Sequence, residues 1–246
     1  GFFTETGFLA ESFVGRPLYR SRHITAPSLR TDIRSARQFA SYLFRPESKS
    51  LISRGPTFLL NPIWDHQGTR LDVYRELGMS WEFPGLTYFE VFRVADRERL
   101  RPRDFPALVE NRDFAYARNG VYFSSQYVQA VNFTAEYERG TGINFLPPAG
   151  QEPVLANLTR ANLGVTLRPL TPLRVENTYL LERLTGRDDG ASIFNNHILR
   201  SHWNWQFNRE LSLRVILQYD AVLANPDRTA LENSKNFNAD FLFTYL

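Results

Sequence analysis

A repeated alternation of apolar and polar residues, in stretches about ten residues long, constrains this chain more than any other feature. Across 211–220 every odd position is apolar and the even positions are polar apart from Ile216, and across 237–245 the odd positions are again all apolar. Successive side chains of a strand point to opposite faces, so each stretch predicts a strand with one apolar and one polar face. A tilted strand of about 9–11 residues crosses a bilayer. Repeated alternation of that length is typical of an antiparallel transmembrane β-barrel, which is the all-β fold we expect.

Composition is compatible with this interpretation and excludes several others. The 246 residues have a mean hydropathy of −0.36 and contain no run of 18 apolar residues, so no membrane-spanning helix is predicted. A transmembrane β-barrel needs no such apolar run, because only every second residue of its strands meets lipid. The chain has no cysteine, which excludes disulfides, thiolate metal sites and cysteine nucleophiles.

The charge pattern argues against a nucleic-acid partner. The net charge is +3, and Lys49 and Lys235 are the only lysines. Basic residues alternate with acidic ones along the predicted strands, whereas a nucleic-acid interface needs a patch of one sign. Residues 1–5 lack the basic start and apolar core of a signal peptide, which an outer-membrane protein needs, so we expect a mature form or a fragment.

The predicted turns alternate between short and long. Short turns are expected near 84–85, 126–130, 168–172 and 208–210, and long loops at 96–118, 140–156, 185–192 and 221–235. This sorting is typical of outer-membrane barrels, which have short periplasmic turns and long extracellular loops. With the weaker candidates 2–14, 33–44 and 51–64 the count is about 10–12 strands. Segment 86–95 is the least regular, because Glu90 falls on the face of Tyr88, Phe92 and Val94, and we expect a bulge or a different register there.

The alternation also assigns side chains to faces. Polar-face residues are expected to line the lumen, either filling it with paired charges or lining a pore that selects solutes. They are Arg160, Arg168, Arg174, Glu176, Glu182, Arg200, His202, Arg214, Asp220 and Asp240. Aromatic residues of the apolar face are expected to meet lipid and its interfaces. They are Trp81, Tyr179, Trp203, Trp205, Tyr219, Phe241, Phe243 and Tyr245.

Five segments carry a resemblance to a known family. They are 29–34 (LRTDIR), 64–68 (WDHQG), 119–125 (NGVYFSS), 205–214 (WQFNRELSLR) and 218–219 (QY). In this order they resemble the outer-membrane β-barrel, a domain of unknown function, that follows a domain similar to the family-9 carbohydrate-binding module in large bacterial proteins. The resemblance covers about the last 220 residues. It implies an outer-membrane location and a link to glycans through a domain absent from this chain, and it supplies no catalytic residues.

The chain departs from that family at both ends. The binding module is missing, and the family usually runs past a segment like 241–246 into another turn and strand. We therefore expect residues 1–246 to be a single barrel domain that is truncated at both ends. A truncated barrel has two open edges, so we do not expect it to be stable alone in lipid.

No residue constellation predicts catalysis, a metal site or a cofactor. His197 and His202 lie five positions apart on one predicted strand, so they face opposite sides and cannot share a metal. The carboxylates of Glu176 and Glu182 share a strand face, but six residues span about 20 Å. Glycosidase carboxylates lie only about 5–9.5 Å apart. Three functions remain open: a conduit for solutes, a filled membrane anchor that displays a carbohydrate-binding domain, and a carbohydrate-active hydrolase.

Overall fold

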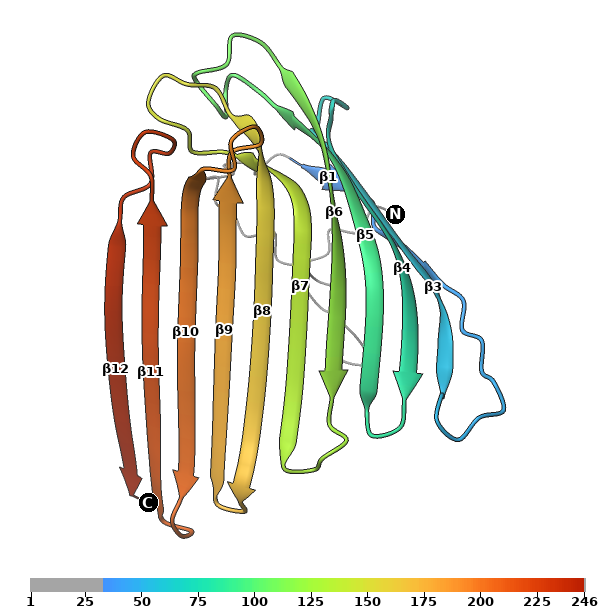
Figure 1. The fold of residues 1–246 in the computed structure, drawn as a ribbon, viewed down its shortest axis with the longest axis vertical. Helices are drawn as coiled ribbons and strands as arrows, with labels where there is room; N and C mark the ends of the chain where they lie inside the picture. Colours follow the sequence, from blue (N-terminus) through green and yellow to red (C-terminus); the bar gives the residue numbers. More distant parts are fainter. Residues whose placement is uncertain (1–32, 246) are drawn as a thin grey trace.

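The computed structural model describes residues 33–245, whose regular structure is one antiparallel sheet of twelve strands (Figure 1). The strands are β1 (Arg34–Ser35), β2 (Gln38–Ser41), β3 (Ser53–Trp64), β4 (Arg70–Phe83), β5 (Thr87–Leu100), β6 (Arg112–Ser125), β7 (Val131–Asn144), β8 (Val154–Leu170), β9 (Leu173–Thr185), β10 (Ser192–Gln206), β11 (Leu211–Ala224) and β12 (Ser234–Tyr245). Across these residues no helix is long and apolar enough to span a membrane.

From β3 to β12 each strand pairs with its neighbour in the chain, while β1 and β2 both pair with β3. The all-β antiparallel fold is thus confirmed, but within residues 33–245 the sheet is not closed, because β12 pairs only with β11. The described residues contain twelve strands, which agrees with the expected 10–12, but the strands differ in part from the expected segments. Segment 33–44 supplies two short strands, and the candidate at 2–14 lies outside the described residues.

From β4 to β12 the connections sort by length to the two ends of the sheet, whereas the long connection 42–52 before β3 lies at the same end as the short turns (Figure 1). The turns 84–86, 126–130, 171–172 and 207–210 lie at the short-turn end, where the chain reaches Tyr245. The loops 65–69, 101–111, 145–153, 186–191 and 225–233 lie at the other, long-loop end.

Three predicted long loops, 96–118, 140–156 and 221–235, were too long, and in the last of them β11 continues to Ala224. In the first two, the strands continue to Leu100 and Asn144 and restart at Arg112 and Val154. These strand extensions are rich in charged and small residues, so the apolar/polar alternation does not mark them.

One tight turn requires unusual backbone angles. Gly85 has φ +75° and Leu86 has φ +52° between β4 and β5. Glycine adopts this left-handed region without the Cβ clash that other residues meet, which suits the Pro84-Gly85 turn expected from the sequence.

Cross-strand pairing gives the sheet two distinct faces. Direct partners across an antiparallel ladder share a face. The partners Glu76, Val94, Arg118 and Gly140 continue this rule from β4 to β7. The later registers also join even to even and odd to odd, except for Leu170–Leu173 and Ser192–Thr185 at two register shifts. We call the face of the even-numbered residues of β4–β12 the inner face, and that of the odd-numbered residues the outer face.

The two faces invert the distribution of a soluble protein. On the inner face the charged residues Glu76, Glu90, Asp96, Arg118 and Glu138 are buried. On the outer face large apolar side chains are exposed, with 61% of Leu77 and 70% of Phe241 accessible. Charged residues are rarely buried, and soluble monomers rarely expose a contiguous apolar patch of this kind.

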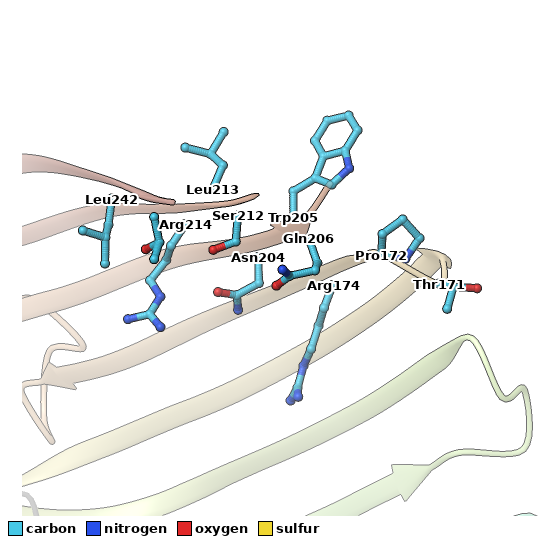
Figure 2. Close-up of a pocket in the computed structure, with 11 residues that line it drawn as sticks. Thr171, Pro172, Arg174, Asn204, Trp205, Gln206, Ser212, Leu213, Arg214 and Leu242 are labelled. Atoms are coloured by element: carbon cyan, nitrogen blue, oxygen red, sulfur yellow. The ribbon is translucent and has the colours of Figure 1, made fainter. Parts of the chain in front are cut away.

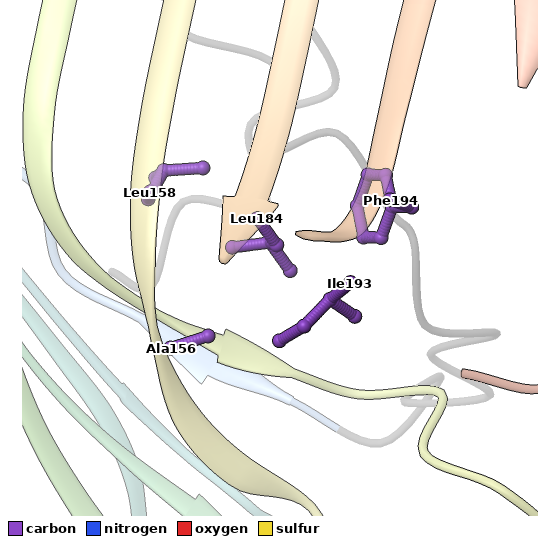
Figure 3. Close-up of a cluster of buried hydrophobic side chains, with 5 residues drawn as sticks. All are labelled: Ala156, Leu158, Leu184, Ile193 and Phe194. Carbon is purple, nitrogen blue, oxygen red and sulfur yellow. The ribbon is translucent and has the colours of Figure 1, made fainter. Parts of the chain in front are cut away.

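Three apolar clusters fill the middle and the long-loop end of the sheet, and besides inner-face residues they include Ile143 and Ile193 near strand ends. One comprises Tyr74, Phe92, Val94 and Tyr122 on β4–β6. A second comprises Ala156, Leu158, Leu184, Ile193 and Phe194, at the long-loop ends of β8–β10 (Figure 3). A third joins Leu100, Leu108, Phe114 and Ile143 around loop 101–111.

The irregularity expected in 86–95 is absent. No register shift interrupts the pairing of β5 with β4 or β6. Glu90 simply shares the inner face with Tyr88, Phe92 and Val94, and these apolar residues contribute to the inner cluster rather than to the outer face.

Candidate functional site

A chain of alternating charges crosses the inner face from β5 to β9. We call it the ion-pair ladder; its members are Asp96, Arg118, Glu138, Arg160 and Glu182. Arg118 donates from Nη1 to Asp96 Oδ2 at 2.8 Å and from Nε to Glu138 Oε2 at 2.5 Å. Arg160 Nη2 donates to Glu182 Oε2 at 2.8 Å, and its Nη1 lies 3.8 Å from Glu138 Oε1.

Strand register explains why these charges meet. Glu138, Arg160 and Glu182 are direct cross-strand partners, and Arg118 pairs with Gly140 one inner position away from Glu138. The Glu138 side chain has no accessible surface, and Arg118 and Asp96 are nearly as buried. A buried charge without a partner costs several kcal/mol, so the alternation of signs is what permits this polar interior.

A more open polar region lies at the short-turn end of the inner face. Arg174, Asn204 and Arg214 are direct partners on β9, β10 and β11. Figure 2 shows both arginines reaching to one side of the sheet, opposite to Trp205 and Leu213. They line a pocket of about 250 Å³ together with Thr171, Pro172, Trp205, Gln206, Ser212, Leu213, Leu242 and Thr244.

The charges around this pocket are only partly compensated. Arg174 forms an ion pair with Glu176, whose other carboxylate oxygen lies 3.3 Å from His202 Nδ1. Arg214 is exposed, and within residues 33–245 no carboxylate pairs with it. The pocket therefore presents guanidinium, amide and hydroxyl groups that can hydrogen-bond an anion or a sugar hydroxyl.

The structure places most of the predicted lumen residues on one face. By register, all except Arg168 lie on the inner face; Arg168 sits at the register shift between Leu167 and Leu170, which leaves its face unassigned. Arg160 with Glu182, and Arg174 with Glu176 and His202, are brought together, whereas Arg200 and Asp240 make no ion pair within the described residues. That this face lines a lumen stays a prediction.

The sequence analysis missed three members of the ladder. Asp96 and Arg118 fell within the supposed loop 96–118, and Glu138 was not singled out. Only the structure shows that Glu138 meets two arginines, its direct partner Arg160 and the neighbouring Arg118.

All eight predicted lipid-facing aromatics lie on the outer face. They are Trp81, Tyr179, Trp203, Trp205, Tyr219, Phe241, Phe243 and Tyr245. Trp81 packs against Phe89 beside turn 84–86, with ring centroids 5.6 Å apart, and Trp205 stacks on Phe207 at 4.9 Å beside turn 207–210. Tyr179 lies further from the turns, where its hydroxyl bonds His197 Nδ1 at 2.9 Å.

The apolar part of the outer face has a definite height. On β11 it runs from Leu211 to Leu223, which is about 41 Å of strand and, at a tilt of about 40°, roughly 31 Å along a barrel axis. Polar groups within it are satisfied locally: Ser201 donates to Asn177 at 2.7 Å and accepts from Trp203 Nε1 at 2.7 Å. We call this region the apolar band.

The loops of the long-loop end are joined into one collar. Asp65 of loop 65–69 lies 3.4 Å from Arg101 of loop 101–111, and Phe105 of that loop stacks on Phe145. Thr229 of loop 225–233 donates to the Leu146 carbonyl at 2.7 Å. Its neighbour Arg228 forms an ion pair with Asp189 of loop 186–191. We call the five linked loops the loop collar.

Two carboxylates of the collar are held ionised. Burial raises the pKa of Asp65, but the backbone N–H groups of Thr69 and Gln67 and the charge of Arg101 outweigh it and leave the pKa below its usual value. The backbone N–H of Ala191 and the guanidinium of Arg228 likewise lower the pKa of Asp189. These links therefore persist at neutral pH.

Within residues 33–245 no group of three histidine, cysteine or carboxylate side chains could hold a metal ion. No protein-family model matches the chain, and no curated protein matches its sequence. The family suggested by the sequence motifs therefore stays a prediction.

Proposed function

We propose that this chain forms the wall of a transmembrane β-barrel in a bacterial outer membrane, and that the barrel conducts polar solutes such as glycans. The observation that carries the proposal is the inverted sheet: charges are buried on the inner face while large apolar side chains are exposed on the outer face. In water, proteins bury apolar side chains and expose charged ones. A β-barrel in a bilayer does the reverse, because lipid surrounds its outer face and its polar groups face the interior.

The inner face at the short-turn end supports the conduit. Arg214 and Asn204 present hydrogen-bonding groups to the pocket, and Arg174, which pairs with Glu176, lines it beside them. Rings of such groups are what pores use to attract and release solutes through many weak contacts. Glycans suit this lining, because guanidinium and amide groups bind their hydroxyls.

A specific observation favours a second function, a non-conducting anchor. The ion-pair ladder, the apolar clusters and the loop collar together pack the inner face toward the long-loop end. A lumen filled in this way stiffens a barrel without passing solute. Such a barrel would hold an attached carbohydrate-binding domain at the cell surface.

Two measurements on the full-length protein test these functions in order. Flotation with phosphatidylcholine vesicles tests membrane insertion; a protein that stays soluble without detergent contradicts the barrel. Single-channel recording in planar bilayers then separates conduit from anchor, because steady current supports the conduit and an inserted but silent protein supports the anchor.

Charge reversal gives the conduit a specific signature. In a conducting barrel, Arg174→Glu with Arg214→Glu should shift ion selectivity toward cations, since both arginines line the short-turn pocket. The matched control, Arg187→Glu with Arg209→Glu, makes the same change in net charge in the connecting loops and should leave selectivity near that of the wild type.

A further inference from the structure

A row of arginines on the outer face borders the apolar band. Direct cross-strand pairing joins Arg93 of β5 to Asn119, Arg139, Thr159, Arg183 and finally Asn195 of β10. We call these six residues the arginine row. Arginine alternates with a neutral hydrogen-bonding residue, so successive arginines are two strands, or roughly 10 Å, apart.

The row marks a sharp boundary. The adjacent outer row toward the short turns belongs to the apolar band and comprises Val91, Val121, Tyr137, Ala161, Leu181 and, on β10, His197, whose ring nitrogen bonds the Tyr179 hydroxyl. Toward the long loops the outer face of β5 is again basic, with Arg97 and Arg99, and Asp113 bonds Arg99 at 2.6 Å. The arginine row is therefore the first charged row above the band.

The three arginines of the row are available to an external ligand. Arg93, Arg139 and Arg183 are exposed. Arg93 donates to Asn119 at 3.0 Å, and within residues 33–245 none of the three forms an ion pair with a carboxylate. Three positive charges thus stand at one level of the outer face with no negative charge of the described chain to balance them.

We propose that the arginine row binds the phosphate groups of anionic lipids in the leaflet on the long-loop side. The inference rests on the proposed membrane location, since that places the row where hydrocarbon gives way to headgroups. The guanidinium fork matches phosphate oxygens in two parallel hydrogen bonds, and the charge is more weakly hydrated than an ammonium. The neutral Asn119 and Thr159 between the arginines add donors without adding repulsion.

The alternative to lipid phosphate is that water alone solvates the arginine row. Arginines at the edge of an apolar band also extend their guanidinium groups into bulk solvent while the stems cover apolar surface. Water solvation predicts no preference among lipid headgroups, whereas the proposal predicts a preference for phosphomonoester lipids that falls as salt is raised.

The test compares lipid binding by the detergent-solubilised full chain and two charge-matched variants. Native mass spectrometry counts bound phosphatidic acid and phosphatidylcholine of identical acyl chains. The wild type should prefer phosphatidic acid, and R93Q/R139Q/R183Q should lose most of that preference, because each arginine near a membrane surface contributes about fivefold. The control R45Q/R187Q/R209Q removes the same charge from exposed loops and should keep it.

Flotation of the same proteins with phosphatidylcholine vesicles separates this proposal from the one it rests on. Failure of the wild type to float overturns the membrane location and the lipid site together. The lipid site alone is overturned in two cases. In the first, the wild type floats but native mass spectrometry shows no preference for phosphatidic acid. In the second, both triple variants lose that preference equally. If R93Q/R139Q/R183Q does not fold, the single variants, each with its control, decide the question.

Discussion

At the residue scale, Glu138 is the centre of the ion-pair ladder. Its side chain is fully buried and contacts two arginines, Arg118 at 2.5 Å and Arg160 at 3.8 Å. Replacing one partner of a buried ion pair leaves an uncompensated charge, which typically costs about 3–5 kcal/mol. We expect Glu138→Gln to lower the free energy of unfolding by about 3 kcal/mol, measured by urea titration of the vesicle-inserted protein.

The matched control is Glu210→Gln, which removes the same charge from the exposed turn 207–210. An exposed carboxylate contributes at most about 1 kcal/mol, so the control should unfold almost as the wild type does. Equal urea midpoints for the two variants would mean that the ladder does not hold β6, β7 and β8 together.

At the element scale, β5 and β6 depend on a glycine beneath an aromatic ring. Gly120 is the direct partner of Phe92, and a Cβ on Gly120 would lie 2.1 Å from the ring atom Cζ. We expect Gly120→Ala to destabilise the folded protein by about 1–3 kcal/mol through overpacking. Adding Phe92→Leu should recover part of that loss, and a double-mutant cycle measures the coupling. If the two substitutions change the free energy of unfolding additively, residues 92 and 120 are not in contact.

The sequence predicts a strand well where the two faces of that strand differ clearly in polarity. From 161 to 245 the faces differ strongly, and alternation predicts the strands and the side on which Arg174 and Trp203 lie. In β5 both faces carry apolar residues, so the pattern gave a false irregularity at Glu90. At the long-loop end of β5 charged residues run together from Asp96 to Arg99, and small residues begin the extension of β7 at Gly140. Alternation therefore missed the strand ends at Leu100 and Asn144.

The candidate site was less predictable than the fold, because it depends on register. The sequence places Arg160 and Glu182 on polar faces, but their contact at 2.8 Å follows from the pairing of β8 with β9. The loop collar joins segments as distant as Leu146 and Thr229, and no local pattern in the chain marks such contacts.

At the scale of the whole molecule, the sheet carries two boundaries at different ends. Aromatic side chains such as Trp81, Trp205 and Tyr245 gather toward the short turns, and the arginine row lies toward the long loops. Between them stands an apolar band roughly 30 Å high, about the thickness of the hydrocarbon core of a bilayer. The inner face shows no corresponding band, since its charges continue from Glu76 to Asp240.

This arrangement predicts that the cost of a charge on the outer face depends on its depth. Arginine introduced singly at the odd positions of β11, from Leu211 to Leu223, should be most destabilising near Val215 and Leu217, by about 2–4 kcal/mol, and nearly neutral at both ends. Arginine at the even positions Ser212 and Gln218 should have a small effect, because these residues share the inner face with Arg214. Urea titration in vesicles measures each variant. A flat profile at the odd positions contradicts a membrane around the outer face, whereas a peak displaced toward Leu223 moves the bilayer past the arginine row.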